Sequence, residues 1–157
     1  PVIETCKAAV VTTFAGRGLV PATYPYCWGS FLPRPDTAPA IARAGLVIVL
    51  GSELSEVDLW REHLGHRAPM VRVDIDPEVL SDLHNADLRI AMRVEDFVPA
   101  LVAALKDVPR VSEWAAKDFA RDLSVWRAEA DHVYSGLFPQ LKLFGMQCLR
   151  TLWFIPI

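Results

Sequence analysis

The sequence predicts an α/β fold with a mostly parallel sheet, and three observations support this prediction. Residues 46–50, LVIVL, are apolar at every position, which indicates a strand covered on both faces. Residues 70–75 form a second apolar run that ends in an Asp-Pro-Glu helix start. Residues 95–106 carry apolar side chains along one helical face. Strand, loop and helix repeated at this spacing indicate parallel βαβ units.

Other elements are expected between and around these three. Residues 8–13, AAVVTT, are rich in β-branched residues and predict a strand that runs into a glycine turn. Residues 19–35 carry several prolines and predict a long irregular loop, a kind of segment that is often functional. Helices are expected over residues 36–44 and 55–64, and a short strand over residues 88–92.

The chain is expected to divide into two parts. Residues 1–108 form the α/β domain, and residues 109–157 form a helical linker with an atypical tail. Within the second part, residues 112–134 have the pattern of a longer and more charged helix, typical of a connector or packing arm. The apolar run 143–157 is too short to cross a bilayer and contains Arg150, so no membrane span is expected.

Composition narrows the class of protein. The 157 residues are 52% apolar, which is ample for a globular core, and the formal net charge is −3. Acidic and basic residues alternate without a basic stripe, which excludes nucleic acid as a partner. The three cysteines are widely separated and form no CxxC pair, and the N-terminal residues lack the layout of a secretory signal. A cytoplasmic location is therefore expected.

Two carboxylates stand out at the end of the second apolar run. Asp74 and Asp76 lie two residues apart, at the carboxyl end of a predicted parallel strand, where such sheets bind ligands. A carboxylate there can accept hydrogen bonds from the hydroxyl groups of a ribose. For Asp76 the alternative is a helix cap before Pro77. A metal pair is a third interpretation, although no further oxygen ligand is evident nearby.

A glycine turn supplies a second set of candidate cofactor-binding residues. Gly16, Arg17 and Gly18 follow the predicted strand 8–13. Such a turn can offer backbone amides to a phosphate, with Arg17 as the counter-charge. The alternative is a plain turn, because an isolated Gly-x-Gly is common in proteins.

Two more motifs carry polar residues. Gly51 and Ser52 lie at a third strand end and are also candidate cofactor-binding residues, although Glu53 follows them and would repel a phosphate. His63 and His66 form an HxxH pair without a third ligand, so they are interpreted as surface histidines. No catalytic residue and no metal ligand is assigned from the sequence.

Four blocks of the sequence follow one another in a characteristic order: VVTTFAGRGLVPATYP (10–25), AIARAGLVIVLGSELSEVD (40–58), VRVDIDPEVL (71–80) and NADLRIAMRVEDFVPALVAAL (85–105). In this order, they resemble the central domain of thiamine-diphosphate-dependent enzymes of the acetolactate synthase and 2-oxo acid decarboxylase type. The specificity lies in the order of the blocks, since each alone is common. The stretch LGSELSEVDLW is more similar to decarboxylase-type members than to FAD-containing synthases.

The resemblance implies a Rossmann-like parallel sheet of six strands and a scaffold role. Thiamine diphosphate and magnesium would lie between N-terminal and C-terminal catalytic domains of paired subunits, so this chain would not bind them and would not be catalytic alone. Its partners would be those two domains within a homo-oligomer. The intact parent would be a lyase or transferase acting on 2-oxo acids. Some members hold FAD or ADP in the crevice at the strand ends.

Several positions depart from the pattern of the family. Its first strand and glycine-rich turn should precede Pro1, so the chain is expected to begin within the first helix. Glu53 occupies a position that is often arginine in FAD-binding relatives, and Met92-Arg93 replaces a Gly-Asp pair. The tail 145–157 does not resemble the usual entry to the C-terminal domain, which suggests a truncated, engineered or aberrantly terminated product.

Two other interpretations compete with the scaffold. The first is a free-standing module that binds ADP or FAD at the strand ends. The second is a structural fragment whose exposed apolar tail mediates oligomerisation. Binding of a nucleotide would favour the first alternative, and loss of an assembly on deletion of the tail would favour the second.

Overall fold

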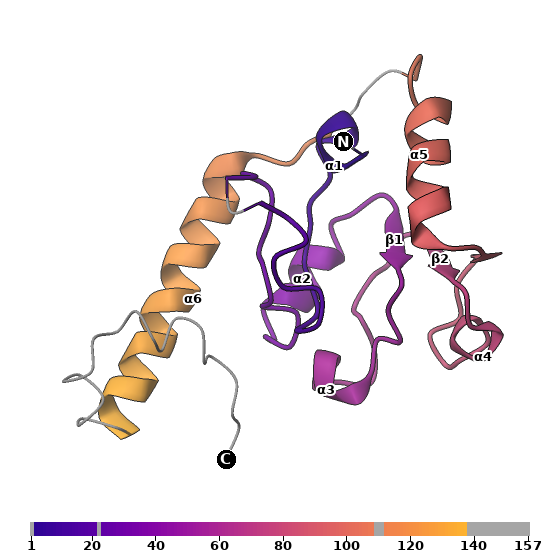
Figure 1. Ribbon diagram of the computed structural model, residues 1–157. Coiled ribbons are helices and arrows are strands. Elements are labelled where there is room, and N and C mark those ends of the chain that lie inside the picture. Colours follow the sequence, from indigo (N-terminus) through magenta and orange to yellow (C-terminus); the bar gives the residue numbers. More distant parts are fainter. Residues whose placement is uncertain (1, 22, 109–111, 138–157) are drawn as a thin grey trace. The chain divides into compact units, whose positions relative to one another are not determined.

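Three parallel strands form one sheet in the described part of the chain (Figure 1). The computed structural model describes residues 2–21, 23–108 and 112–137. The strand order is β1-β2-β3, with β1 at Val47–Leu50, β2 at Met70–Asp74 and β3 at Leu88–Ala91. Both pairs are parallel, so the predicted α/β fold with a parallel sheet is confirmed. The resemblance implied six strands, whereas the described residues form this three-stranded sheet and one isolated bridge.

Helices connect and flank the strands. Helix α5 packs against β2 and also against α1, while α4 packs against β2 and β3. The six helices of the described residues are α1 Val2–Cys6, α2 Thr37–Ile41, α3 Glu56–Leu59, α4 Pro77–Leu80, α5 Val94–Ala104 and α6 Ala116–Leu137. The crossovers between successive strands therefore contain the helices that a parallel sheet requires.

Four predicted helices have different bounds in the structure, and the one predicted over 95–106 is α5, Val94–Ala104. The helix predicted over 36–44 ends at Ile41. After it, the amides of Arg43 and Ala44 donate to carbonyl oxygens three residues earlier, so short turns continue to Ala44. The helix predicted over 55–64 ends at Leu59, because Trp60 adopts a left-handed conformation with φ of +51°. The helix predicted over 112–134 begins only at Ala116.

The strand predicted over residues 8–13 is wrong as a regular strand. Val10 forms an isolated parallel bridge with Cys27, and the Thr12 amide donates to the Gly29 carbonyl oxygen at 2.9 Å. Gly29 has a φ of +66°, which lies outside the extended region. The pairing is therefore limited to this one bridge and the hydrogen bond from Thr12.

The apolar core combines residues of the sheet with residues of the helices and loops around it, including the loop before α2. Its buried residues come from β1, β2, α2, α3 and the loops next to these elements and to β3: Leu32, Ile41, Val49, Leu54, Leu59, Leu64, Met70 and Ala86. The Arg61 guanidinium ties this loop to α3, donating to the carbonyl oxygens of Leu32 at 2.8 Å and Leu59 at 3.2 Å. Burial lowers the pKa of Arg61, whose hydrogen bonds replace lost water contacts.

The described chain divides into two compact units, one ending at Ala116 and one beginning at Lys117. Within the first, the Trp114 ring meets Trp28 edge-on at 5.6 Å between centroids, and the Arg43 guanidinium lies 5.0 Å from the Trp114 centroid. Within the second, Arg121 of α6 pairs with Asp122 at 2.9 Å. The predicted division at residue 108 stays a prediction, and the tail 145–157 lies outside the described residues.

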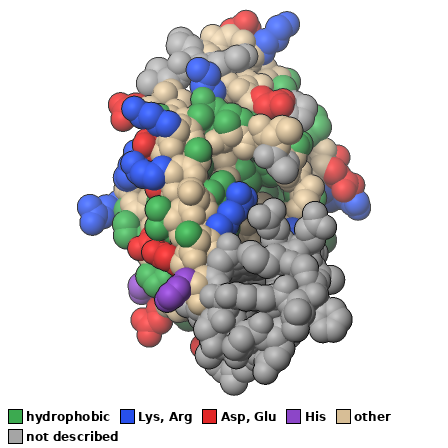
Figure 2. All heavy atoms as spheres, turned by 90° about the vertical axis from the view of Figure 1, so that its left-hand side faces the viewer, with side chains coloured by type: hydrophobic (Ala, Val, Ile, Leu, Met, Phe, Trp, Pro, Cys, Tyr) green, Lys and Arg blue, Asp and Glu red, His purple; other side chains and the backbone are tan. Residues whose placement is uncertain are grey.

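Charged side chains of both signs are interspersed on the face of the molecule shown in Figure 2. Helix α6 is an example, because Asp118 and Asp122 surround Arg121 there. Among the described helices, none is long and apolar enough to cross a membrane.

Candidate functional site at the strand ends

The carboxyl ends of the three strands meet at one edge of the sheet. Leu50 is in register with Val73, and the Gly51 amide donates to the Val73 carbonyl oxygen at 2.9 Å. On the other side, the Met92 amide donates to the Asp74 carbonyl oxygen at 3.0 Å. Gly51, Asp74 and Met92 are thereby brought into one row, in the position where parallel sheets bind ligands.

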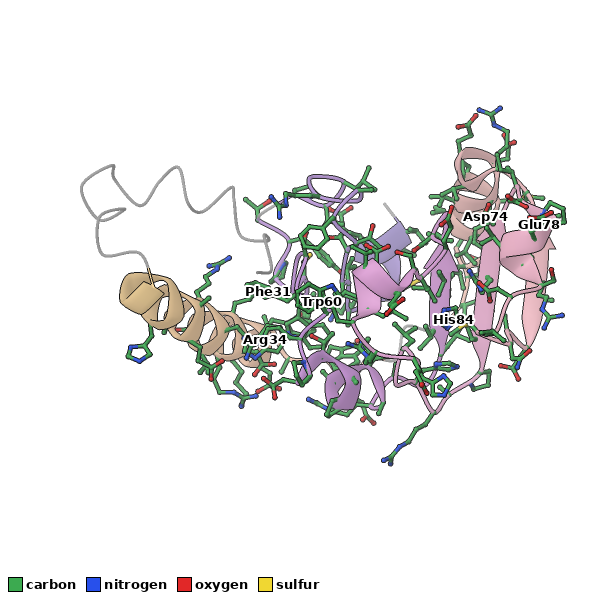
Figure 3. All side chains as sticks on the ribbon, turned by 90° about the horizontal axis from the view of Figure 1, so that it is seen from below. Phe31, Arg34, Trp60, Asp74, Glu78 and His84 are labelled. Carbon is green, nitrogen blue, oxygen red and sulfur yellow. The ribbon has the colours of Figure 1, made fainter. Side chains whose placement is uncertain are left out.

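Asp74 and Asp76 both accept hydrogen bonds from the local backbone. Asp74 Oδ1 accepts from the Asp76 amide at 3.0 Å, and Asp76 Oδ1 accepts from the Glu78 amide at 2.8 Å. Asp76 is the N-cap of α4, so the alternative interpretation of this residue as a helix cap is confirmed. Asp74 is half-buried and forms an Asx turn of the kind that begins many such connections. Figure 3 shows Asp74 and Glu78 in the same region, with His84 farther along the sheet.

Gly51 and Ser52 form a tight turn directly after β1. Gly51 has a φ of +56°, and a Cβ atom at this position would lie 3.4 Å from Val94 Cγ2. Glycine is therefore favoured here by the backbone conformation and by the approach of α5. Ser52 Oγ accepts from the Leu54 amide at 3.2 Å, which fixes the following residues. The structure thus brings Gly51 and Ser52 together with Asp74.

The second candidate turn, Gly16 to Gly18, is held by its own residues. The Gly16 amide donates to Thr13 Oγ1 at 3.2 Å, and a Cβ atom at Gly16 would meet side chains of the same turn. The Arg17 guanidinium lies 5.7 Å from the centroid of the Phe14 ring. Gly18 has a φ of +89° and open space around its Cα. The Gly16 amide, which the sequence offered to a phosphate, already has a partner.

The most enclosed polar network in this region involves Arg72, which the sequence analysis did not identify. Arg72 points from the middle of β2 and is only 1% exposed. Its Nη1 pairs with Asp82 Oδ1, and its Nη2 donates to the Ser52 carbonyl oxygen at 2.9 Å. Arg72 therefore links the loop after β1 to the loop after α4 across the sheet. A buried guanidinium without these partners would be strongly destabilising.

Asp82 and His84 extend this network. Asp82 Oδ1 also accepts from the His84 amide at 2.9 Å, and His84 Nε2 lies 3.1 Å from the Leu54 carbonyl oxygen. Burial raises the pKa of Asp82, but the hydrogen bonds from Arg72 and from the His84 amide, with the charge of Arg72, outweigh it and lower the pKa overall. One signal was available in the sequence: a lone arginine inside the apolar strand VRVD requires a buried partner.

The chemistry of the described residues does not fit a thiamine diphosphate and magnesium site. Magnesium prefers several oxygen ligands, and the part of the chain that the structure describes contains no group of three or more acidic, histidine or cysteine side chains that could hold a metal.

The two histidines of the HxxH pair differ in their exposure. His63 is exposed, whereas His66 is only partly exposed and its Nδ1 is enclosed without a hydrogen-bond partner.

A cavity of about 300 Å³ lies between α1 and the proline-rich loop, lined by residues that include Glu4, Lys7, Tyr24 and Tyr26. The Tyr24 hydroxyl lies 2.8 Å from the carbonyl oxygens of both Ile3 and Ala8, which share its single proton. Burial, helped by neighbouring groups, raises the pKa of Tyr24 to about 12. Tyr24 therefore ties the loop to α1 and stays protonated at neutral pH.

Comparison with known proteins decides the family of this chain. Residues 2–101 match the family described as "Thiamine pyrophosphate enzyme, central domain". The chain belongs to this family. The match covers α1, the three strands and most of α5, so the central domain includes every residue of the strand-end row. The resemblance and the Rossmann-like fold expected from the sequence are both confirmed.

Two curated relatives match the central domain and its surroundings. The probable 2-ketoarginine decarboxylase AruI of Pseudomonas aeruginosa is 33% identical over 118 residues, which cover 75% of this chain and 21% of that protein. Pyruvate oxidase of Lactiplantibacillus plantarum is 23% identical over 127 residues, which cover 80% of this chain and 21% of that protein. The chain therefore spans about a fifth of the length of these relatives.

Proposed function

We propose that the chain is the central scaffold domain of a thiamine-diphosphate-dependent enzyme acting on 2-oxo acids, and that it performs no catalysis alone. The family match over residues 2–101 carries this proposal. The substrate class is supported by the names of the two relatives, since 2-ketoarginine and pyruvate both carry a carbonyl group next to a carboxylate. The parent enzyme would be a lyase or transferase.

The cofactor and the reacting groups of the parent would then lie on other domains. Thiamine diphosphate and magnesium would be held by N-terminal and C-terminal domains of a cytoplasmic homo-oligomer. The donor set of the central domain supports this placement, because Asp76 caps α4, Asp82 pairs with Arg72, and the described residues contain no group of three or more acidic, histidine or cysteine side chains that could hold a metal. The contribution of this chain would be to hold the other domains in position.

The coding frame on both sides of Pro1 and Ile157 tests the proposal. We expect it to encode flanking domains, and we expect the longer protein to release carbon dioxide from a 2-oxo acid when thiamine diphosphate and magnesium are supplied. Assays with 2-ketoarginine and with pyruvate show which of the two relatives is the better guide to the substrate. Carbon dioxide release by the 157-residue chain alone would contradict the scaffold role.

The second candidate function is a nucleotide-binding module for ADP or FAD. It is supported by the placement of Gly51, Ser52 and Asp74 at adjacent strand ends, where a ribose could reach the free oxygen of Asp74. Calorimetry with ADP tests it, with Asp74→Asn as the variant and Asp76→Asn as its matched control. Binding that only the Asp74 variant weakens would support the nucleotide module, and absence of binding would remove it.

A further inference from the structure

The outer edge of β3 is the side on which the sheet ends after its last strand. Helix α5 follows β3 directly and packs against β2 and α1, so the chain turns away from this edge. The match to the central domain ends at residue 101, within α5, and β3 is the last strand of the matched segment. In the described residues, no strand lies beside β3 on this side.

The backbone of β3 alternates between bonds to β2 and groups that point outward. The Met92 amide donates to the Asp74 carbonyl oxygen at 3.0 Å, and successive residues of a strand bond in opposite directions in the plane of the sheet. The amide and carbonyl groups of Arg89 and Ala91 therefore point away from β2. These groups can bond to an added strand without any change in the pairing of β2 and β3.

The side chains at this edge include an exposed apolar row. Leu88, Ile90 and Met92 lie on one face of β3, because side chains two residues apart in a strand point the same way. Leu88 is 53% exposed and Met92 is 40% exposed. Ile75, which follows β2 on the same face, is 72% exposed. Exposed apolar side chains gathered at one edge are typical of an interaction site.

The charges along β3 favour a second copy of β3, in one antiparallel register. Registers that keep outward residues opposite each other differ by two residues. Two of them place Arg89 opposite Arg89 or opposite Arg93 of the second copy, and like charges directly opposite are destabilising. In the register between them, whose two-fold axis passes between the two Ile90 residues, Arg89 faces the small Ala91. Asp87 then lies opposite Arg93 of the second copy, so opposite charges meet just beyond both ends of the paired strands.

The side chains of Asp87 and Arg93 are placed to make these contacts. Asp87 is exposed, and the Met70 amide donates to its Oδ2 at 2.8 Å, which fixes the carboxylate beside the start of β3. Arg93 is 65% exposed and pairs with the equally exposed Glu95. An exposed pair of this kind contributes little stability, so Arg93 can turn toward a second carboxylate at little cost.

We propose that the outer edge of β3 binds a second copy of this chain, so that the two β3 strands pair antiparallel and the two sheets become continuous. Arg89 of each copy would exchange both main-chain hydrogen bonds with Ala91 of the other. Leu88 would face Met92 of the other copy, which covers the exposed apolar row. The pairing depends on the sheet alone and not on the scaffold role proposed above.

Sedimentation of the 157-residue chain measures the association. Because the paired strands are short, we expect a weak dimer with a dissociation constant on the order of 100 µM. Hydrogen exchange followed by NMR locates the contact: the amides of Arg89 and Ala91 should exchange more slowly as the dimer fills, whereas Met92 is already bonded to β2. A chain that stays monomeric up to about 1 mM, or protection centred on β1, would overturn the proposal.

Two substitutions change the edge in different ways. Ala91→Pro removes the outward amide and leaves the inward bond of Met92, and proline is tolerated on strand edges. It removes half of the intermolecular main-chain bonds, so the dimer should weaken about thirtyfold, whereas Ala91→Val keeps the amide and should keep the dimer. Loss of the dimer in neither proline nor valine variant would overturn the assignment to this edge.

The second substitution tests the charge pairing and remains informative if the proline variant does not fold. Arg93→Glu places two carboxylates opposite each other at both ends of the paired strands, so we expect the dimer to weaken about tenfold. Arg17→Glu makes the same change of charge at an exposed turn outside the sheet and should leave the dimer unchanged. Equal effects of both variants would show that net charge, and not this pairing, controls association.

Cross-linking tests the register. Residue 90 lies on the two-fold axis in a pair without main-chain hydrogen bonds, where the two Cα atoms would be about 4.5 Å apart, within the range of a disulfide. Under mild oxidation, Ile90→Cys should therefore link residue 90 of both copies faster than Arg89→Cys or Ala91→Cys links its own position. Mass spectrometry of peptides separates this link from links through the three native cysteines. Faster linking at residue 89 or 91 would overturn the register.

Discussion

The acidic pair at the end of β2 and the ion pair in its middle differ in what they stabilise. Asp74 and Asp76 are conspicuous in the sequence, yet the described hydrogen bonds of their carboxylates reach only two residues along the chain. Arg72 is inconspicuous, yet it joins Asp82 and the carbonyl group of Ser52 across two loops. Residues that attract notice in a sequence can thus have local structural roles, whereas one buried charge organises the surroundings of the candidate site.

The largest expected effect in this comparison comes from removing the carboxylate partner of Arg72. Asp82→Ala leaves a guanidinium that is 1% exposed with the Ser52 carbonyl group as its remaining described partner. We expect the free energy of unfolding to fall by about 3 kcal/mol, the low end for a broken buried pair, because Asp82 is itself 27% exposed. Urea unfolding measures this change.

The double variant Arg72→Met with Asp82→Ala is the control for that experiment. It replaces the buried charge with an apolar side chain of similar length, so much of the lost stability should return. The single variants Arg72→Met and Asp82→Ala are measured beside it. If the double variant loses as much free energy of unfolding as the two single variants together, the ion pair does not account for the loss.

The same pair predicts a dependence of stability on pH. The pKa of Asp82 is lower in the folded protein than its ordinary value, so the ionised form is favoured by folding. Its contribution is fully present above the unfolded pKa of about 4 and is lost as the pH falls through the lower folded pKa. Lowering the pH should therefore narrow the difference in free energy of unfolding between the wild type and Asp82→Ala. A constant difference down to pH 2 would contradict this origin.

A smaller effect is expected at the cap of α4. Asp76→Ala removes the acceptor of the Glu78 amide and should lower the free energy of unfolding by about 1 kcal/mol. Asp76→Ser keeps a capping oxygen and should recover most of that loss. Thermal unfolding of both variants, followed by circular dichroism, checks the prediction, and equal losses would exclude a capping role.

The smallest effect is expected at Asp74. Asp74→Asn keeps an oxygen that can accept from the Asp76 amide, so stability should change by less than about 0.5 kcal/mol. Urea unfolding under the conditions used for Asp82→Ala gives a direct comparison. A loss as large as that of Asp82→Ala would show that Asp74, too, has a long-range partner.

The sheet could be predicted from the sequence because its signal is local. All three strands of the sheet were placed to within one residue at each end, since a run such as LVIVL is buried on both faces and has no competing interpretation. The ends of the short helices were less accurate, because a left-handed residue such as Trp60 has no compositional signature. The strand at residues 8–13 failed because its length depends on Gly29, far along the chain.

The candidate site was predicted less completely than the fold. Strand ends carrying Gly51, Ser52 and Asp74 do meet, as the parallel topology requires. The network of Arg72, Asp82 and His84 was missed because its links from Arg72 to Asp82 and from His84 to Leu54 join residues 10 and 30 positions apart, and no spacing rule specifies such contacts. The roles of Gly51, Ser52 and Asp74 in binding a nucleotide stay a prediction.

Titration of the 157-residue chain with thiamine diphosphate and magnesium, followed by calorimetry, tests most directly whether the central domain supports chemistry that other domains perform. We predict no heat of binding at millimolar cofactor, because the described acidic side chains are not gathered into a metal site. Saturable binding at micromolar concentrations would contradict the scaffold role and place the cofactor on this chain.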